Sequence, residues 1–233
     1  MTKRIFDFIF VTIALILLSP VLFFIIIILR FTGEGEVFYL QKRPGLNFRE
    51  FDLFKFATMT KNSSNFGAGD VTTKNDPRVL PFGKILRKTK LNEIPQLFNI
   101  LKGDMSLVGP RPLPLKNFKI YTPEAQIIIT KMTPGLTGVG SIVFRNEEEV
   151  IEKLGIPLEQ CLKEVIMPYK ANLEMWYYNN QSVLLYFKII LITAWVVIFP
   201  KSNIVKKLIP ALPRNTYFES LLLSEKQQCK QVL

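Results

Sequence analysis

A long apolar run near the start of the chain constrains the fold more than any other feature. From Ile5 to Leu29 the sequence is almost wholly apolar. About 25 residues in a helix extend roughly 37 Å, which is enough to cross the hydrocarbon core of a bilayer. The run is too long for a signal peptide and lacks a small-residue cleavage site. Hydropathy alone therefore predicts a single transmembrane anchor.

Two details favour a different geometry for this helix. Ser19-Pro20 interrupts the run near its middle, and Pro20 removes the backbone hydrogen bond to Ile16. We expect the Ser19 hydroxyl to compensate by bonding back to Leu15. Basic residues precede and follow the run, so both ends carry the charge typical of the cytoplasmic side. We predict a re-entrant helix that enters and leaves by the same membrane face, with a spanning helix as the alternative.

The composition limits the classes of partner. Lys and Arg number 30 against 19 Asp and Glu, and the net charge of +11 favours nucleic acid, anionic lipid or phosphorylated substrates. A hydrophobic fraction of 48% and 19 Phe make a membrane surface the better choice. The absence of His excludes Ser-His-Asp and Cys-His catalysis and any His-ligated metal. The two cysteines, Cys161 and Cys229, form neither a disulfide framework nor a zinc spacing.

The segment from Arg87 to Pro112 carries the strongest functional pattern. Asn92 is expected to be the N-cap of a helix, with Glu93 at its positive end and Pro95 in its first turn. The apolar face of that helix and its C-terminal stop are Leu91, Ile94, Phe98, Leu101 and Gly103. The basic side chains around it are Arg87, Lys88, Lys90, Lys102 and Arg111. A helix start ringed by cations predicts a phosphate site.

Upstream of this segment the sequence predicts a hairpin and a loop. Residues 37–42 and 51–58 read as two strands joined by a Pro-Gly turn. Lys55 shares an apolar face of the second strand, so its ammonium either snorkels to solvent or points into a site. Residues 61–76 are rich in Asn, Ser, Gly and Thr and predict a mobile surface loop. Arg78 is interpreted as a solvated surface charge.

Several separate motifs together resemble those of the monotopic phosphoglycosyl transferases, the bacterial sugar transferases that begin glycan assembly on a polyprenyl phosphate. They are Lys-Phe-Ala-Thr-Met from residue 55, Asp-Pro-Arg from 76, Asn-Glu from 92, Val-Gly-Pro-Arg-Pro from 108 and Pro-Gly-Leu-Thr-Gly from 134. The resemblance covers most of the chain. It makes Lys55 a candidate site residue, and it also implies a re-entrant helix broken at a Ser-Pro pair.

The resemblance implies a UDP-sugar donor, a polyprenyl phosphate acceptor, release of UMP and dependence on Mg²⁺. Glu93 is the implied metal ligand, and its carboxylate oxygens are of the type that Mg²⁺ prefers. Arg87, Lys88 and Arg111 are the expected phosphate-binding residues, and the prolines on both sides of Arg111 restrain its backbone. Arg145 matches an Arg-Asn pair of the family and is expected to contact substrate.

The chain departs from the family at two positions. Asn92 stands where the family has the Asp that forms a covalent phosphosugar intermediate, and a neutral amide is a poor nucleophile. Ala57 replaces a usual Arg. Four explanations are open for Asn92: Glu93 attacks instead, the lipid phosphate attacks directly, the protein is a weak or inactive relative, or the Asn is an engineered change that traps substrate.

The C-terminal half adds membrane features. Gly135 is expected to have a positive φ in a turn, and Glu147–Glu149 is expected to begin an exposed helix. Trp176–Tyr178 is an aromatic cluster suited to a headgroup interface. Residues 182–199 are apolar except for Lys188, and we predict a helix lying flat or half-buried in the leaflet, with a second span as the alternative. Basic residues 206–207 suit anionic membrane lipid.

The sequence thus predicts an α/β fold with an N-terminal re-entrant membrane helix (1–32), a small cytoplasmic catalytic domain with a short β-hairpin (33–181), and a membrane-associated C-terminal helix and tail (182–233). The predicted enzyme acts on the cytoplasmic face of a bacterial inner membrane in polysaccharide synthesis. A non-catalytic membrane scaffold, favoured by Asn92 and Ala57, is the alternative. A nucleic-acid partner is not expected because no RNA-binding motif is present. A homo-oligomer is left open.

Overall fold

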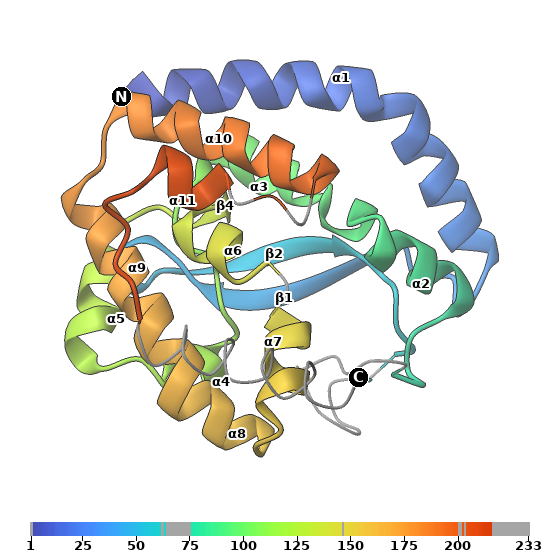
Figure 1. The fold of residues 1–233 in the computed structure, drawn as a ribbon. Helices are drawn as coiled ribbons and strands as arrows, with labels where there is room; N and C mark the ends of the chain where they lie inside the picture. Colours follow the sequence, from blue (N-terminus) through green and yellow to red (C-terminus); the bar gives the residue numbers. More distant parts are fainter. Residues whose placement is uncertain are drawn as a thin grey trace. The chain divides into compact units, whose positions relative to one another are not determined.

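The computed structural model describes residues 2–61, 63, 76–145, 147–199, 202 and 204–215. It is a mixed helix and strand fold, as predicted, and the chain divides into two compact units, residues 1–107 and 108–233 (Figure 1). The loop predicted over 61–76 lies almost entirely outside the described residues. The division into a membrane helix, a catalytic domain and a C-terminal part stays a prediction.

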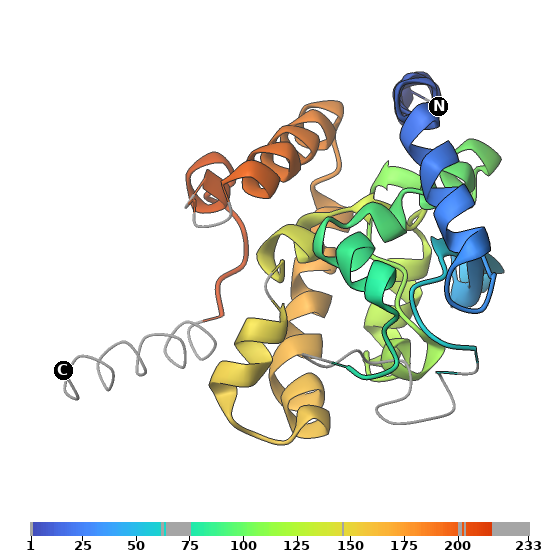
Figure 2. The same ribbon diagram turned by 90° about the vertical axis from the view of Figure 1, so that its right-hand side faces the viewer.

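The first unit begins with α1 (Thr2–Phe31), which contains the apolar run and Pro20. Its ribbon changes direction part-way along its length (Figures 1 and 2). A proline inside a helix explains a bend because it removes one backbone hydrogen bond and crowds the preceding turn. The Ser19 hydroxyl donates to the carbonyl oxygen of Ile16 at 2.8 Å, so the predicted partner Leu15 was wrong. In a regular helix the carbonyl oxygen of Ile16 would accept from the amide of residue 20, which proline lacks. The Ser19 hydroxyl therefore replaces the lost hydrogen bond.

The N-terminal turns of α1 are held by polar contacts within this unit. Asp7 is 2% exposed, and its carboxylate accepts from the Ser106 hydroxyl at 2.7 Å and from the Leu107 amide at 2.9 Å. The Arg4 guanidinium donates to the carbonyl oxygens of Ile100 and Leu101, which end a later helix. A cation at a helix C-terminus is electrostatically favourable. These contacts fix the start of α1 on the segment that precedes residue 108.

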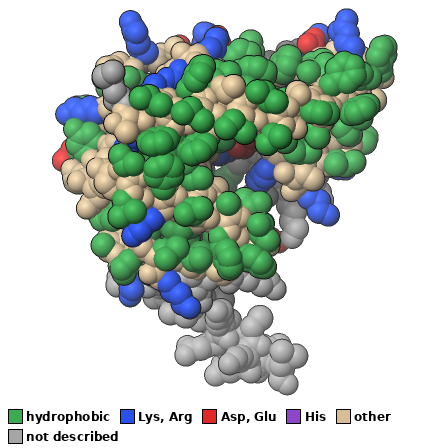
Figure 3. Space-filling view, turned by 90° about the horizontal axis from the view of Figure 1, so that it is seen from above, with side chains coloured by type: hydrophobic (Ala, Val, Ile, Leu, Met, Phe, Trp, Pro, Cys, Tyr) green, Lys and Arg blue, Asp and Glu red, His purple; other side chains and the backbone are tan. Residues whose placement is uncertain are grey.

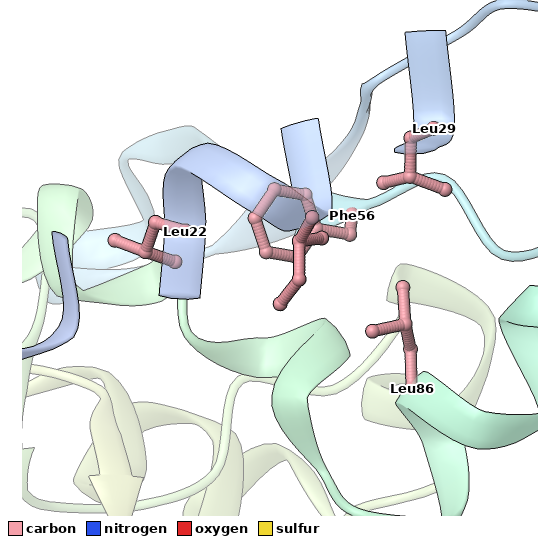
Figure 4. Packing of buried hydrophobic residues seen from close by; sticks show 5 residues of the cluster. Leu22, Leu29, Phe56 and Leu86 are labelled. Atoms are coloured by element: carbon pink, nitrogen blue, oxygen red, sulfur yellow. The ribbon is translucent and has the colours of Figure 1, made fainter. Parts of the chain in front are cut away.

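The C-terminal turns of α1 are held by apolar packing in the same unit. Leu22, Ile25 and Leu29 are buried together with Phe56 and Leu86. Figure 4 labels Leu22, Leu29, Phe56 and Leu86, and the Leu29 and Leu86 side chains point toward each other there. Burying a Leu or Phe side chain contributes about 2 kcal/mol, so this cluster strongly favours the observed position of the second half of α1.

Much of the remaining surface of α1 is apolar and exposed. The exposed large side chains on it include Ile5, Phe8, Ile9, Ile13, Ile16, Leu17, Phe23, Phe24 and Phe31. Only 17% of the most apolar 18-residue window is buried, which is far less than in a core helix of a soluble protein. Figure 3 looks down on the side where α1 lies in Figure 1, and hydrophobic side chains (green) are abundant there. By length and composition, α1 is able to cross a membrane.

The predicted hairpin is confirmed. Strands β1 (Phe38–Pro44) and β2 (Glu50–Phe56) pair in antiparallel register, with Phe38 opposite Phe56, and the short helix η1 (Leu46–Phe48) joins them. The further elements of the first unit are α2 (Pro81–Lys88), η3 (Leu91–Glu93), α3 (Gln96–Lys102) and most of β3 (Ser106–Val108).

A buried asparagine attaches α3 to the hairpin. The Asn99 side chain accepts from the Phe54 amide at 2.9 Å and donates to the Asp52 carbonyl oxygen at 2.8 Å, so β2 and α3 are joined through one side chain. Gly103 ends α3 with φ 96°, as predicted. The predicted apolar face was wrong, because Phe98 is exposed whereas Leu97 and Ile100 are buried.

The second unit is mainly helical. Its elements are α4 (Leu115–Phe118), α5 (Pro123–Thr130), β4 (Gly135–Thr137), α6 (Val139–Val143), α7 (Glu147–Leu154), α8 (Leu158–Gln160), the π-helical turn η4 (Cys161–Ile166), α9 (Met167–Asn179), α10 (Val183–Ile198) and α11 (Ile204–Leu208). Helix α9 packs against α5 and α6, and its Leu173 and Tyr177 are among the most buried side chains. Tyr177 is therefore a core residue and not part of a headgroup-facing cluster.

Helix α10 buries one side and exposes the other. Leu185, Ile189, Ile192 and Val196 recur every three to four residues and are buried, and the Thr193 hydroxyl lies 2.8 Å from that of Thr137 on β4. Its exposed apolar side chains include Leu184, Leu191, Trp195, Val197 and Ile198. One side of α10 therefore packs within the second unit, and its position relative to a membrane stays a prediction.

Candidate active site

The Asn92-Glu93 pair lies on η3, a single 3₁₀ turn, and not at the start of the long helix that the sequence predicts. Lys90 precedes the turn with φ 60°, and α3 starts only at Gln96 after Pro95. The prediction that Asn92 is an N-cap was wrong, since neither η3 nor α3 has a side-chain cap. Pro95 explains the interruption, because proline lacks a backbone N–H and its ring crowds the preceding turn. A helix cannot continue through it from the preceding residues, so Asn92 and Glu93 lie on a separate turn.

The Asn92 side chain has an unsatisfied oxygen. Its Oδ1 atom is buried and accepts no hydrogen bond from the described residues. A buried polar atom without a partner costs free energy, and such atoms in native proteins usually have a functional or solvent partner. Glu93 follows directly and is half-buried. The turn therefore carries an amide oxygen and a carboxylate in succession.

Cationic side chains come from the elements that pack around η3. Arg87, at the end of α2, is half-buried, and its Nε donates to the Thr58 hydroxyl at 2.8 Å. Thr58 is buried just beyond β2, so this bond orients the guanidinium. Lys55 is half-buried on β2, and both α2 and β2 contact η3. The fold thus brings Lys55, Arg87 and Glu93 onto adjoining elements, whereas Lys88 is exposed.

Arg78 is not the solvated charge that the sequence predicts. Its guanidinium donates to both carboxylate oxygens of the buried Asp76, at 2.9 and 2.6 Å, and its side chain is 10% exposed. A fork-to-carboxylate pair of this kind fixes both groups in one plane. The Asp-Pro-Arg motif therefore has a structural role at the entry to α2.

Arg111 lies in the second unit on a rigid turn. Pro110 and Pro112 are buried and Arg111 is exposed between them. The Gly109 amide donates to the Thr137 carbonyl oxygen at 2.9 Å, and the Gly135 amide donates to the Pro110 carbonyl oxygen at 2.8 Å. These two bonds hold the turn from both sides, and the prolines leave its backbone little freedom.

Gly135 is glycine for a reason other than the predicted one. It has no positive φ and belongs to a strand. A Cβ placed on it would come within 2.1 Å of the Gly109 nitrogen, so any side chain would separate the two crossing backbones. The Pro-Gly-Leu-Thr-Gly motif is therefore a close backbone crossing that supports the Arg111 turn.

Arg145 also lies in the second unit. Its Nη2 donates to the Val197 carbonyl oxygen of α10 at 3.4 Å, and its buried Nη1 has no hydrogen-bond partner among the described residues. Asn146, its partner in the family motif, lies outside the described residues. The predicted site residues thus belong to two groups, with Lys55, Arg87, Lys88, Asn92 and Glu93 in the first unit and Arg111 and Arg145 in the second.

Comparisons with known proteins identify the family of the chain. The family model described as bacterial sugar transferase matches residues 1–200. The chain belongs to the bacterial sugar transferase family. It is 36% identical over 191 residues to the sugar transferase EpsL of Bacillus subtilis, covering 82% of this chain and 84% of that protein. It is 38% identical to the exopolysaccharide production protein ExoY of Rhizobium meliloti, covering 63% and 71%.

A third relative carries a more specific name. The chain is 35% identical to the UDP-glucose:undecaprenyl-phosphate glucose-1-phosphate transferase of Klebsiella pneumoniae, covering 83% of this chain and 39% of that longer protein. As a member of this family, the protein is an enzyme of the phosphoglycosyl transferase class. Members of the family are membrane-associated enzymes, and the described residues of this chain include one helix, α1, that is long and apolar enough to cross a membrane.

Sequence analysis of this sugar transferase missed a buried acidic residue in the second unit. Glu174 on α9 is 3% exposed, and burial raises the pKa of its carboxyl to about 7, although a hydrogen bond from the Gly140 amide and the charge of Lys170 both lower it. Glu147 begins α7, as predicted, but it is not a plain exposed residue, since it is half-buried and forms an ion pair with Lys170 at 2.7 Å. The only signal in the sequence is a single carboxylate at a helix position flanked by apolar residues.

Proposed function

We propose that this protein transfers a sugar 1-phosphate from a UDP-sugar to undecaprenyl phosphate, releasing UMP, on the cytoplasmic face of a bacterial inner membrane. The observation that carries the proposal is the family match over residues 1–200, which contains Arg87, Glu93 and Arg111. The printed name of the Klebsiella relative supports the classes of donor and acceptor.

The reaction is a phosphoryl transfer from a nucleoside diphosphate sugar to a lipid monophosphate, and its products are a lipid diphosphate sugar and UMP. An oxygen of the lipid phosphate forms a bond to the sugar-linked phosphorus, and the bond from that phosphorus to the bridging oxygen breaks, so UMP leaves. Such reactions require positioning and neutralisation of charge more than covalent participation by the protein. Arg87, oriented by Thr58, and Arg111, held between prolines, are suited to this because a fixed guanidinium contacts phosphate oxygens in pairs.

The residues of η3 fit a Mg²⁺ ion. Among the described residues no cluster of three or more acidic, Cys or His side chains forms an all-protein metal site. Mg²⁺ in nucleotide-dependent enzymes commonly takes one or two protein oxygens and completes its shell with substrate phosphates and water. The Glu93 carboxylate and the unsatisfied Asn92 Oδ1 are such oxygens. When bound there, the ion would neutralise charge on the diphosphate.

Asn92 also bears on the order of steps. Its neutral amide does not supply the attacking carboxylate of a covalent route, and Glu93 is assigned to the metal. We therefore propose that the lipid phosphate attacks the donor directly while both substrates are bound. In this scheme Asn92 positions the metal and the sugar transferase forms no phosphosugar adduct.

We further propose that α1 is re-entrant. Its first turns, through Asp7, and its last turns, through Leu22 and Leu29, contact the same compact unit. A straight helix of 30 residues would separate its ends by about 45 Å, and a spanning one would place them on opposite membrane faces. Contacts from both ends to one unit, with a bend between them, support entry and exit by one face.

The topology is tested with single cysteines. Cysteines placed at Thr2 and at Glu34, in a chain whose Cys161 and Cys229 are replaced by Ser, are expected to react with a membrane-impermeant maleimide only in inverted vesicles. Labelling of one of them in right-side-out cells would identify a spanning helix and contradict the proposal. Labelling of both in lysed membranes is the control for accessibility.

The activity is tested by UMP release. Purified protein in detergent with undecaprenyl phosphate and Mg²⁺ is expected to release UMP from at least one of a panel of UDP-sugars, and EDTA is expected to abolish the release. The same reaction without the lipid phosphate is the control, and it is expected to give no UMP under direct transfer. Failure with every donor in the presence of folded protein would refute the proposed activity and favour a non-catalytic membrane scaffold.

A further inference from the structure

Glu174 is positioned by a close contact with the backbone of Gly140, and a side chain at position 140 would displace the carboxyl. The Gly140 amide, in the first turn of α6, donates a hydrogen bond to the Glu174 carboxyl. A Cβ placed on Gly140 would come within 2.5 Å of Glu174 Oε1. The other carboxyl oxygen, Oε2, is buried and has no hydrogen-bond partner among the described residues. The carboxyl is thus directed at one backbone amide.

The groups that face this carboxyl come from four elements. Lys170 lies one turn earlier on α9 and contacts both carboxylate oxygens of Glu147 on α7, at 2.8 and 2.7 Å. Tyr121, just before α5, is buried near both carboxylates, and burial together with those charges raises the pKa of its hydroxyl well above the ordinary value. The α6 contribution is the Gly140 amide. Lys170 forms its ion pair with Glu147, so among the described residues no cation forms an ion pair with Glu174.

A short run of backbone contacts connects Gly140 with Arg111. Gly138 is the N-cap of α6, and a Cβ placed on it would come within 2.1 Å of the Gly109 carbonyl oxygen. Thr137, one residue earlier, accepts from the Gly109 amide, and Gly135 donates to Pro110. Displacement of the start of α6 therefore moves the backbone against which the Gly109–Arg111 turn is packed.

We propose that Glu174 is a positioning residue for Arg111. Its carboxyl fixes the Gly140 amide, and through the backbone crossing of residues 135–138 with 109–110 this contact fixes the turn that carries Arg111. The Arg111 guanidinium is the group that binds substrate phosphate. This inference rests on the proposed function for the role of Arg111. The contact between Glu174 and the crossing does not depend on that role.

The charge of Glu174 gives the proposal a distinctive pH dependence. The hydrogen bond from the Gly140 amide is stronger when the Glu174 carboxyl is ionised than when it is neutral. The Arg111 turn is therefore held best above the Glu174 pKa of about 7. Stability changes in the other direction. The folded-state pKa lies above the unfolded value of 4.5, so the native state binds more protons and the free energy of unfolding falls as pH rises from about 4.5 to 7.

The test compares Glu174→Gln with the wild-type enzyme. The Gln side chain keeps an oxygen for the Gly140 amide and cannot ionise, so it mimics the protonated carboxyl. The first measurement is the ratio of wild-type kcat/KM to that of Glu174→Gln, which is expected to rise about fivefold from pH 6 to pH 8. The second is the difference between the Tm of the wild type and that of the variant, which is expected to fall over the same range. Glu164→Gln, at an exposed carboxylate in the same unit, is the matched control and is expected to follow the wild type in both measurements.

A second measurement is independent of activity. Glu174→Ala in the full chain is expected to accelerate hydrogen–deuterium exchange in a peptide covering Gly109–Arg111 and to leave a peptide from α2, in the first unit, unchanged. Gly140→Ala is expected to do the same, and the double variant is expected to be less affected than the sum of the two. Unchanged exchange at Gly109–Arg111 in Glu174→Ala, or an activity ratio of the wild type to Glu174→Gln that is independent of pH, would overturn the proposal. If the wild type released no UMP at all, only the proposed function would fail, because exchange and Tm would still test the contact.

Discussion

Glu93→Gln is expected to lower UMP release by about a thousandfold or more at saturating Mg²⁺. The amide keeps the size of the carboxyl but removes the negative charge with which Glu93, on η3, is proposed to bind the metal. A bound metal contributes several kcal/mol of charge stabilisation in phosphoryl transfer, and each 1.4 kcal/mol corresponds to tenfold in rate. The measurement is a Mg²⁺ titration of UMP release, in which the variant should show no saturable metal dependence.

Asn92→Asp is the matched variant for this experiment, since it adds a charge one residue away. It is expected to preserve or raise activity, because an aspartate at this position supplies both a stronger metal ligand and the missing nucleophile. Intact-mass measurement after incubation with UDP-sugar alone should show a phosphosugar adduct on Asn92→Asp and none on the wild-type protein. Wild-type turnover by Glu93→Gln would remove Glu93 from the site, and an adduct mapped to Glu93 would replace direct attack by a covalent route.

The features that the sequence predicted well are local ones. The bend of α1 follows from Pro20 and is accompanied by a bond from Ser19, although one carbonyl further along than expected. The hairpin follows from alternating strands around a Pro-Gly turn, and the end of α3 at Gly103 follows from the freedom of glycine to adopt a positive φ. Each of these depends on interactions between residues only a few positions apart.

The features that it missed depend on contacts between distant parts of the chain. Asp7 lies in an otherwise apolar run, and its partners Ser106 and Leu107 follow about a hundred residues later, so no local pattern indicates a buried acceptor there. Gly135 was expected to have a positive φ because turns often require it, whereas the requirement is close approach to Gly109. Asn92 was assigned to a cap because propensity does not reveal that Pro95 isolates η3 from α3.

The candidate site shows the same division. Motifs indicated which side chains to consider, and the fold then supplied what holds them: Thr58 orients Arg87, buried prolines flank Arg111, and η3 presents Glu93. Arg78 carried an equally basic motif and proved to be structural, because Asp76 two residues earlier pairs with it. Charge alone therefore does not distinguish a substrate contact from a structural ion pair, whereas an exposed cation on a rigid backbone does favour a ligand.

Arg111 provides the strongest test of that distinction. Arg111→Ala is expected to lower kcat/KM for the UDP-sugar by about a hundredfold to a thousandfold, the usual effect of removing one preorganised donor to transition-state charge. The Tm should change little, since the side chain is exposed and the turn is held by Pro110, Pro112 and the bonds of Gly109 and Gly135. Arg111→Lys keeps the charge but loses the two-pronged geometry, and we expect a loss of about tenfold.

Lys116, exposed on α4 of the same unit, is the control position, and Lys116→Ala is expected to leave the rate unchanged. A second measurement separates the phosphate contact from a general effect of charge. If an exposed cation acts only at long range, salt screens its effect, so the variant and the wild type become equally active at high ionic strength. The lower activity of Arg111→Ala should instead persist from low to high salt, because the proposed contact is direct. If Arg111→Ala and Lys116→Ala reduced activity equally, the rigid Pro-Arg-Pro turn would be a structural element, and the phosphate contact would have to come from Arg87 or Arg145.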